Sequence, residues 1–400
     1  MKLKNKFIYV IAVLYLSLGA VSAATPAELY DDVWKLVNKK YYDPTNNSQD
    51  WAKWRYRYEH KLKTTEDAYV AIDTMLASLN DPYTRFLPPK EFSEETQSIR
   101  GSLKGIGTQI GLRDGQLVII APLEDSPAER AGLLADDYIL EINGESTKGI
   151  NVDAAADKIR GEKGTTVNLL IQRKGVPNKV YTIVRDEIEV KSVSTKPPFE
   201  TAIPDDVQYI RLSSFISKNA GAEIQEILDK CDNKKGIILD LRSNPGGLLT
   251  NAIYISDMLL QGGVIVSTVD RDRYKTTTRA RYGQMTQKPL VVLINKGSAS
   301  ASEILSGALK DNHRATIVGE QSFGKGLVQE INRLPDEAGM NITIQRYLTP
   351  SGQDINKKGI TPDVVVELTE EHVKNKDDVQ LKKAIEVLEE MTCLVRKNGY

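Results

Sequence analysis

The sequence contains only two cysteines among 400 residues, too few for a disulfide framework. We expect Cys231 and Cys393 to be unpaired thiols, although a single bridge between them stays open for an oxidising compartment. The three histidines, His60, His313 and His372, are not clustered with cysteines or carboxylates at metal-ligand spacing. The sequence therefore indicates no metal site, and its net charge of -1 gives no sign of nucleic-acid binding.

Long apolar runs are also scarce, and the one that stands out lies at the N-terminus. A short basic stretch precedes the apolar residues 7–21, and Val21-Ser22-Ala23 fits a small-x-small cleavage pattern. About 15 residues span only about 22 Å as a helix, less than the roughly 30 Å hydrocarbon core of a bilayer. The pattern predicts a cleaved signal peptide over residues 1–23 and a soluble mature protein in a periplasm, in a lumen or outside the cell. An uncleaved membrane anchor is the alternative.

The rest of the chain divides into four segments of different pattern. Residues 24–98 have apolar positions at helix spacing, and residues 99–187 have about five short strands and two short helices, typical of a small, partly open barrel. Residues 188–366 alternate strand with helix, which favours a mostly parallel sheet with helical cover. Residues 367–400 end in an amphipathic helix. We therefore predict an α/β multi-domain protein.

Within the alternating segment, two stretches are continuous apolar runs. Residues 236–241 and 290–294 have the pattern of buried strands in a parallel sheet. The stretch 270–287 is charged and rich in turn residues, so we expect it to be a surface loop.

Ser300 follows a buried strand and opens a helix. Such a position presents backbone amides and the positive end of a helix dipole to a developing oxyanion. The same serine with Glu303 three residues later also fits a capping box, and this pattern alone favours the helix cap. Ser298 and Ser302 lie at alternate positions, so spacing alone leaves the choice among the three serines open.

Lys325 lies between Gly324 and Gly326 and could serve as the base that a serine nucleophile needs. An amine accepts a proton only when it is neutral, so its pKa must fall by roughly three units from about 10.4, which burial can supply. Gln329 follows four residues later, on the same side if the segment is a strand, and its amide oxygen could orient a neutral amine. A lysine in such a turn is otherwise a surface residue.

The stretch 240–247, DLRSNPGG, ends a buried strand in a turn of nearly bare backbone. An amide of Gly246 or Gly247, paired with that of Ala301, would form an oxyanion hole. This motif alone does not distinguish an oxyanion hole from a plain turn.

Two other chemistries compete with a Ser-Lys hydrolase. Residues 319–325 match the spacing of a nucleotide phosphate loop, but Gly326 stands where the magnesium-binding hydroxyl is required. Asp311 and His313 follow Ser300 as a Ser-His-Asp triad would require, but His313 lies in a polar turn and is expected at the surface. The residues favour the Ser-Lys hydrolase.

Together these stretches closely resemble the carboxyl-terminal processing (tail-specific) proteases of peptidase family S41. The resemblance covers nearly all of the chain after residue 23. It is carried by the stretches 81–86 (DPYTRF), 105–107 (GIG), 240–247 (DLRSNPGG), 298–303 (SASASE), 323–329 (FGKGLVQ) and 349–352 (TPSG). It implies that Ser300 is the nucleophile, Lys325 the base, Gln329 its orienting partner, and Gly246 and Ala301 the oxyanion hole.

The resemblance also implies a ClpP/crotonase-like α/β protease core with an inserted PDZ β-barrel and helical N- and C-terminal segments. In such a PDZ domain the amides of Ile106, Gly107 and Thr108 would hold the free carboxylate of a peptide tail. Asp311 matches a supporting, structural position of the family. The family needs no metal or nucleotide, so we expect no cofactor.

The activity implied is that of a serine endopeptidase that binds the free, apolar C-terminal tail of exported proteins and cleaves near it. The PDZ domain would also gate the site, which predicts a latent resting state. The helical end segments permit a homodimer, and a regulatory adaptor is a further expected partner. The alternative is a non-catalytic PDZ adaptor that binds tails but leaves them intact. The natural substrate does not follow from the sequence.

Overall fold

The computed structural model describes most of the chain after the predicted signal peptide, which lies outside the described residues. The described ranges are 24–99, 102–113, 115–123, 126–134, 136–189, 192–281 and 283–397. Within these ranges, no helix combines the length and the apolar character needed to cross a membrane.

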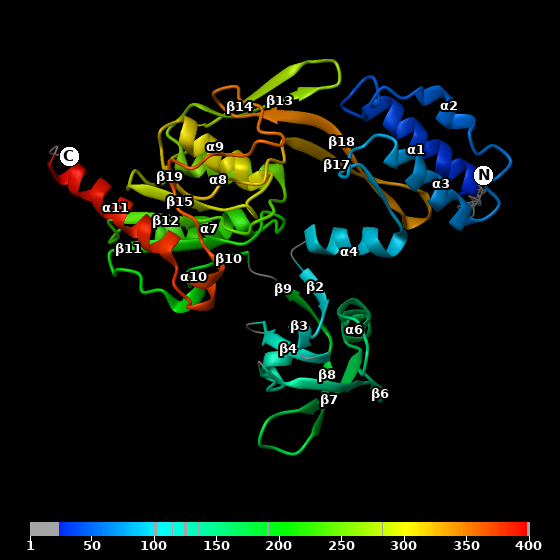
Figure 1. The fold of residues 1–400 in the computed structure, drawn as a ribbon, viewed down its shortest axis with the longest axis horizontal. Helices are drawn as coiled ribbons and strands as arrows, with labels where there is room; N and C mark the ends of the chain where they lie inside the picture. The colour runs from blue at the N-terminus through cyan, green and yellow to red at the C-terminus, as the bar shows by residue number, and fades with distance from the viewer. Residues whose placement is uncertain are drawn as a thin grey trace, which may run out of the picture.

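A six-stranded sheet forms the centre of the larger lobe, with the order β10-β11-β12-β15-β16-β19 (Figure 1). All neighbouring pairs are parallel except the antiparallel pair β10–β11 at one edge. The strands are β10 (Val193–Ser194), β11 (Val207–Leu212), β12 (Gly236–Asp240), β15 (Leu290–Ile294), β16 (Thr316–Gly319) and β19 (Val364–Val365).

Helices cover both faces of this sheet. Alternate strand residues point to opposite faces, so Ile237 and Leu239 join the core under α7 (Ala220–Asp229), α8 (Leu249–Leu259) and α9 (Ala301–Asp311). Ile238 lies on the other face, in the cluster that contains Leu381 and Leu388 of the C-terminal helix α11 (Val379–Lys397). Burial on both faces explains why these strands are continuous apolar runs. The short α10 (Glu370–Lys374) precedes α11.

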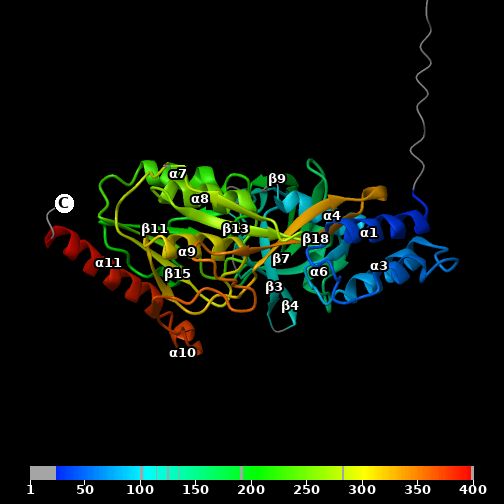
Figure 2. The ribbon, with the colours of Figure 1, turned by 90° about the horizontal axis from the view of Figure 1, so that it is seen from above.

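A second, antiparallel sheet connects the core to the N-terminal helices. It contains β1 (Arg85–Leu87), β18 (Gly339–Leu348), β13 (Val264–Asp270) and β14 (Lys275–Arg279) in that order, and β17 (Leu327–Arg333) also pairs with β18. The helices α1 (Pro26–Lys40), α2 (Trp51–Tyr56) and α3 (Thr65–Ala77) pack around aromatic residues and against β18. The N-terminal helices and α11 lie at opposite ends of the molecule (Figure 2).

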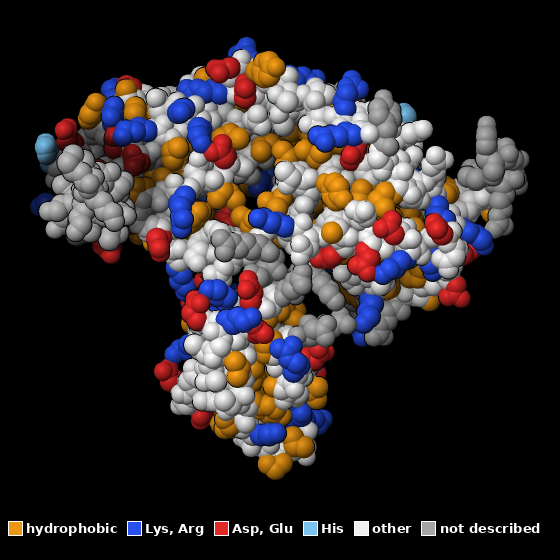
Figure 3. All heavy atoms as spheres, turned by 180° about the vertical axis from the view of Figure 1, so that it is seen from behind, with side chains coloured by type: hydrophobic (Ala, Val, Ile, Leu, Met, Phe, Trp, Pro, Cys, Tyr) orange, Lys and Arg blue, Asp and Glu red, His pale blue; other side chains and the backbone are white. Residues whose placement is uncertain are grey.

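A separate small lobe projects below the central sheet and the N-terminal helices (Figures 1 and 3). Helix α4 (Pro89–Ile99) leads into it, and the antiparallel pair β2 (Ser102–Gly105) and β9 (Asp186–Glu189) forms its stem. The lobe itself has one sheet and two short helices around its own apolar core. Its elements are β3 (Thr108–Arg113), β4 (Gln116–Pro122), α5 (Pro127–Arg130), β5 (Tyr138–Ile142), β6 (Glu145–Ser146), α6 (Val152–Ile159), β7 (Thr166–Gln172) and β8 (Lys179–Val184). Two 3-10 turns elsewhere, Pro198–Glu200 and Pro335–Glu337, complete the secondary structure of the described residues.

The predicted α/β multi-domain class is confirmed, and so is the expectation of unpaired thiols, since Cys231 is buried and free and Cys393 is exposed and free. The loop predicted for residues 270–287 is wrong in part. Residues Lys275–Arg279 form β14, which pairs with β13 over most of its length. Strand pairing with an apolar neighbour overrides the polar local pattern, which is typical of an edge strand with exposed side chains.

Candidate active site

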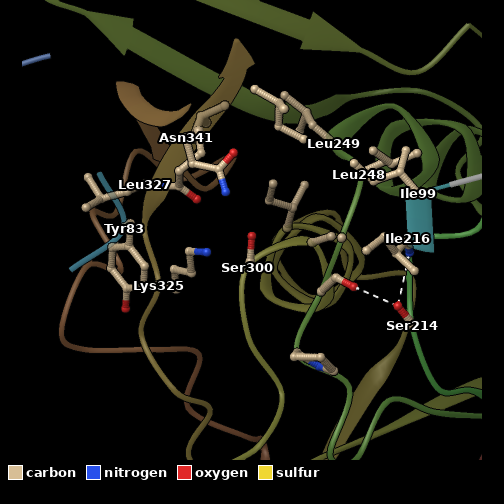
Figure 4. Close-up of a pocket in the computed structure, with 18 of the residues that line it drawn as sticks. Tyr83, Ile99, Ser214, Ile216, Leu248, Leu249, Ser300, Lys325, Leu327 and Asn341 are labelled. Atoms are coloured by element: carbon tan, nitrogen blue, oxygen red, sulfur yellow. Dashed lines mark hydrogen bonds between the residues drawn. The ribbon is translucent and has the colours of Figure 1, made fainter. Parts of the chain in front are cut away.

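Ser300 lies in the turn between β15 and α9, immediately before the first residue of the helix. Its φ of 54° and ψ of -113° are unusual for a residue with a side chain and indicate a strained turn. Two hydrogen bonds hold the turn in place, because the amide of Ala299 (3.0 Å) and the hydroxyl of Ser302 (2.9 Å) both donate to the Asn244 carbonyl oxygen. Ser300 is thus held at the N-terminus of α9, where its hydroxyl points into a cleft (Figure 4).

Glu303 connects the serine to the lysine segment, although its side chain is completely buried. One carboxylate oxygen accepts from the backbone amides of Ser300 (2.8 Å) and Lys325 (2.9 Å). The other accepts from the Gly324 amide (2.7 Å) and the Ser322 hydroxyl (2.5 Å). The sequence suggested Glu303 only as the partner in a helix cap. The structure gives it a larger part, because one carboxylate fixes the backbones of both predicted catalytic residues.

Lys325 enters the same cleft from a segment that runs very close to another part of the backbone. A Cβ on Gly324 would lie 2.8 Å from the Lys358 amide nitrogen, and one on Gly326 would lie 2.7 Å from that of Asn356. The predicted reason for the flanking glycines, close backbone approach, therefore agrees with the geometry. Burial lowers the pKa of the Lys325 amine, while the nearby Asp81 carboxylate opposes this shift. The Lys325 amine and the Ser300 hydroxyl point toward one another in Figure 4.

Gln329 also lines the cleft, but its side chain is engaged elsewhere. Its amide nitrogen donates to the Thr343 hydroxyl on β18 at 3.3 Å. A β-bulge between Val328 and Gln329 shifts the register of β17 against β18. Among the described residues, no hydrogen bond or ion pair joins the Lys325 amine to Gln329 or to Ser300. The three predicted residues share one cleft, and the hydrogen bond expected between Gln329 and Lys325 is not formed in this conformation.

The glycine turn after β12 packs directly against Ser300. A Cβ on Gly246 would lie 2.7 Å from the Ala299 carbonyl oxygen and 2.8 Å from the Ser300 Cβ. The Gly246 amide donates to the side chain of the buried Asn244 at 2.9 Å. Within the described part of the chain, no hydrogen bond is recorded from the amides of Gly247 and Ala301. The turn therefore brings backbone amides beside Ser300.

A buried ion-pair network lies beneath this turn, and no sequence pattern indicated it. The Arg242 guanidinium contacts the carboxylates of Asp240 (2.6 Å) and Asp378 (2.7 Å), and all three side chains are almost fully buried. Burial would lower the pKa of Arg242, but the two carboxylates raise it above its ordinary value. The Tyr209 hydroxyl donates to Asp240 at 2.7 Å. Asp378, at the start of α11, thus ties the C-terminal helix to the residue that precedes the glycine turn.

The cleft around Ser300 and Lys325 has a volume of about 750 Å³. Much of its wall is apolar, and it also contains Glu95, whose carboxylate accepts hydrogen bonds from the side chains of Arg85 and Asn341. The apolar wall comes from Ile99, Ile216, Leu248, Leu249, Ile304, Leu327, Val328 and Ile331. Seen from behind, the surface is hollowed between the lobes, and hydrophobic side chains gather around this hollow (Figure 3). Such a cleft suits an extended peptide with apolar side chains.

The small lobe has a groove of about 250 Å³ between the start of β3 and α6. Ile106, Gly107 and Thr108 line it, together with Val152 and Ile159 of the helix. The carbonyl oxygens of Ile106 and Gly107 already accept from backbone amides, whereas no hydrogen bond is recorded from their own amides among the described residues. The three predicted residues therefore line one groove, and the amides of Ile106 and Gly107 are available to a ligand.

Asp311 and His313 lie at the far end of α9 from Ser300, and neither lines the cleft. The Asp311 carboxylate accepts from the Ser351 amide at 2.9 Å, which stabilises the turn of residues 349–352 and agrees with a structural part for Asp311. Because a helix of 11 residues separates His313 from Ser300, the Ser-His-Asp alternative is wrong.

Comparison with known proteins identifies the family. The model of peptidase family S41 matches residues 206–366, that of the PDZ domain matches residues 118–173, and that of the tricorn protease C1 domain matches residues 22–69. The carboxyl-terminal-processing protease of Synechocystis sp. is 42% identical over 377 residues, which cover 92% of this chain and 87% of that protein. This chain belongs to peptidase family S41. It is a serine peptidase of the carboxyl-terminal-processing type and contains a PDZ domain.

Other relatives and solved structures agree with this assignment. The carboxy-terminal processing protease CtpA of Bacillus subtilis is 37% identical over 356 residues, covering 88% of this S41 chain and 72% of that protein. The solved structure of a photosystem II D1 C-terminal processing protease matches with a TM-score of 0.58 and 33% identity, over 86% of this chain and 94% of that one. The solved structure of the tricorn protease matches with 17% identity and a TM-score of 0.53, over 92% of this chain and 37% of the tricorn chain. At this identity the match supports only the fold.

Proposed function

We propose that this S41 peptidase cleaves by a Ser300–Lys325 dyad. Neutral Lys325 removes the proton from the Ser300 hydroxyl, whose oxygen attacks the carbonyl carbon of a peptide bond. The protonated amine then gives its proton to the leaving nitrogen, and water hydrolyses the acyl-enzyme with the same amine as base. Gln329 orients the amine once it turns away from Thr343.

The observation that carries this proposal is a desolvated amine that faces a hydroxyl at a helix N-terminus. Burial lowers the pKa of Lys325, as a basic role at moderate pH requires. The shared Glu303 carboxylate fixes both backbones, so the reacting groups are preorganised.

We propose that the amides of Gly246 and Ala301 stabilise the oxyanion. Ala301 supplies the first amide of α9, where the helix dipole adds positive potential. The Gly246 amide must leave Asn244 as the substrate carbonyl arrives, or else the neighbouring Gly247 provides the second donor. Either arrangement places the donors on the turn that packs against Ser300.

Substrate selection is proposed to reside in the PDZ groove. Available amides at Ile106 and Gly107 suit a free carboxylate, and the apolar side chains of Val152 and Ile159 suit an apolar final residue. The apolar wall of the catalytic cleft favours cleavage near such a tail. The substrates are therefore exported proteins or peptides with free, apolar C-termini.

The test uses a peptide with an apolar C-terminus and a fluorescent label, in free-acid and amidated forms. Wild type should cleave the free acid faster, and Ser300→Ala and Lys325→Met should cleave neither form. Ser300→Ala should still bind the free acid with wild-type affinity. Because protonated Lys325 is inactive, the cleavage rate should rise with pH as the amine loses its proton. The rise should occur at a pH below the ordinary pKa of lysine. Cleavage by Lys325→Met at the wild-type rate would refute the dyad.

Export is a separate proposal, which rests on the signal-like residues 1–23. Relatives from Arabidopsis thaliana and Tetradesmus obliquus are named as chloroplastic processing peptidases, consistent with proteins that work outside the compartment of synthesis. N-terminal sequencing of the protein from its host should find a mature chain that begins after Ala23. A chain that still begins at Met1 would refute cleavage.

A further inference from the structure

The stretch 81–86 contributes Pro82, Tyr83 and Arg85 to the catalytic cleft, although it lies outside the stretch that matches the S41 family model. Tyr83 is half-buried in the cleft wall, and the Lys325 amine lies 4.4 Å from the centre of its ring. This distance is within the range of a cation–π contact, in which the ring face attracts a positive charge. Figure 4 shows the ring of Tyr83 beside the Lys325 side chain, on the side away from Ser300.

The ring of Tyr83 is in contact with this amine. Among the described residues, the Lys325 amine has neither a hydrogen bond nor an ion pair. Ionisable groups on four elements also face it and are too far away to bond to it. These groups are Asp81 of the turn, Arg85 of β1, Glu95 of α4 and Glu303 of α9. The buried Tyr347 hydroxyl of β18 donates instead to the Lys325 carbonyl oxygen.

Tyr83 is held firmly enough to act on the lysine. The Asp81 carboxylate accepts from the Tyr83 amide at 3.0 Å and from the Thr84 hydroxyl at 2.7 Å. The same Thr84 hydroxyl accepts from the Thr343 amide at 3.0 Å, which attaches the turn to β18. Thr343 is also the residue that holds Gln329, so the ring and the orienting amide share one support.

Burial and the ring act on the lysine in opposite directions. Burial disfavours the ammonium, whereas the face of an aromatic ring favours it. A carboxylate in contact with the amine would hold it charged and unable to act as a base. An aromatic ring attracts the charge more weakly, so it can position the amine and still allow the proton to leave.

We propose that Tyr83 is a positioning residue for the catalytic lysine. Its ring holds the Lys325 ammonium beside the nucleophile in the resting enzyme and raises the pH at which the amine becomes free to act on Ser300. This inference rests on the proposed dyad and adds to it a residue from the N-terminal part of the chain. The ring should raise the pH at which Lys325 loses its proton by about half a unit to one unit, the effect expected from the usual strength of a partly desolvated cation–π contact.

The decisive measurement is the titration of Lys325 itself, by NMR of full-length protein labelled with carbon-13 at the lysine Cε. The Lys325→Met spectrum identifies the signal. Tyr83→Leu keeps apolar cover over the amine but removes the ring, so the titration midpoint should fall by about half a unit to one unit. Tyr83→Phe keeps the ring and should retain the wild-type midpoint. The acidic limb of the kcat/KM profile should move with the midpoint.

Variants with fluorinated phenylalanines at position 83 provide a second test, because the side chain keeps nearly the same shape throughout the series. Each added fluorine weakens the negative potential of the ring face, so the Lys325 midpoint should fall in steps. Equal midpoints across this series, or a rise in Tyr83→Leu, would overturn the inference. The titration reads the amine directly, so it is independent of cleavage. Failure of the dyad would appear instead as activity retained by Lys325→Met or Ser300→Ala.

Discussion

The substitution Glu303→Gln tests whether one buried carboxylate assembles the active site. Glu303 accepts four hydrogen bonds, of which three come from backbone amides that cannot reverse their direction. The fourth comes from the Ser322 hydroxyl, which can rotate. A glutamine at this position keeps one oxygen and replaces the other with an NH₂ group, so at least one backbone amide must face another donor.

The structure sets the expected magnitude. If the NH₂ group faces Ser300 and Lys325, both of their amides lose an acceptor. A hydrogen bond to a charged group contributes about 1.5–3 kcal/mol, so losing two lowers the free energy of unfolding by about 3–6 kcal/mol, and the opposite orientation, which loses only the Gly324 bond, lowers it by about 1.5–3 kcal/mol. Domains of ordinary stability have about 5–15 kcal/mol in total, so Glu303→Gln should fold with a reduced margin.

Activity should fall more than stability alone explains. The same two bonds fix the backbones of the proposed nucleophile and base, and a shift of about 1 Å between reacting groups lowers rates by roughly 100-fold. We therefore expect kcat for a peptide substrate to fall at least that far at a temperature where the variant is fully folded. Urea unfolding gives the stability, and initial rates give kcat and KM separately.

The matched control is Ser306→Ala on the same helix. The Ser306 hydroxyl is buried and donates to the Ser302 carbonyl oxygen at 2.7 Å, without contact to Glu303's carboxylate. It should lose about 1 kcal/mol of stability and keep its kcat. The reasoning is refuted if Glu303→Gln keeps both wild-type stability and wild-type kcat, or if Ser306→Ala loses as much kcat as Glu303→Gln does.

Two further outcomes are expected. Gly246→Ala places a Cβ 2.7 Å from the Ala299 carbonyl oxygen, at a φ of 98° that disfavours any side chain. Acylation of Ser300 by a fluorophosphonate should therefore slow at least tenfold. An unchanged rate of labelling would contradict the packing of this turn on Ser300. Asp378→Asn removes one of the two charges that compensate the buried Arg242, so urea unfolding should show a loss of about 3–5 kcal/mol. A loss under about 1 kcal/mol, the range of surface pairs, would show that the pair is no stronger than an exposed one.

The elements that the sequence predicted best are those whose environment is uniform along the chain. Residues 290–294 form β15 as expected, because a strand buried on both faces must be apolar at every position. The polar strand β14 was missed because its existence depends on β13, which accepts it at the sheet edge. The threonines within Lys275–Arg279 were the available signal, since β-branched residues favour strands.

The candidate site divides in the same way. Ser300, Lys325 and Gln329 could be grouped because short motifs with known chemistry contain them, and all three line one cleft. Glu303 was visible only as a capping partner, since its contact with the lysine segment requires the fold. Tyr83 belonged to the stretch 81–86 that carries the family resemblance, but nothing there indicated a role for it, and Asp378 had no local signal at all, because the partners of both lie far away in the sequence.

These two distant contacts connect segments outside residues 206–366 to the surroundings of Ser300 and Lys325. The turn before β1 supplies the ring beside Lys325, and the start of α11 supplies a carboxylate to Arg242 under the glycine turn. Residues 206–366, which match the S41 family model, contain neither Tyr83 nor Asp378. That segment alone would leave Arg242 buried without the Asp378 carboxylate, one of its two charged partners. Breaking a buried ion pair is strongly destabilising. If the proposed roles of Lys325 and of the glycine turn hold, the N-terminal turn and the C-terminal helix should belong to the catalytic unit, because Tyr83 contacts the Lys325 amine and Asp378 contacts Arg242 before the glycine turn.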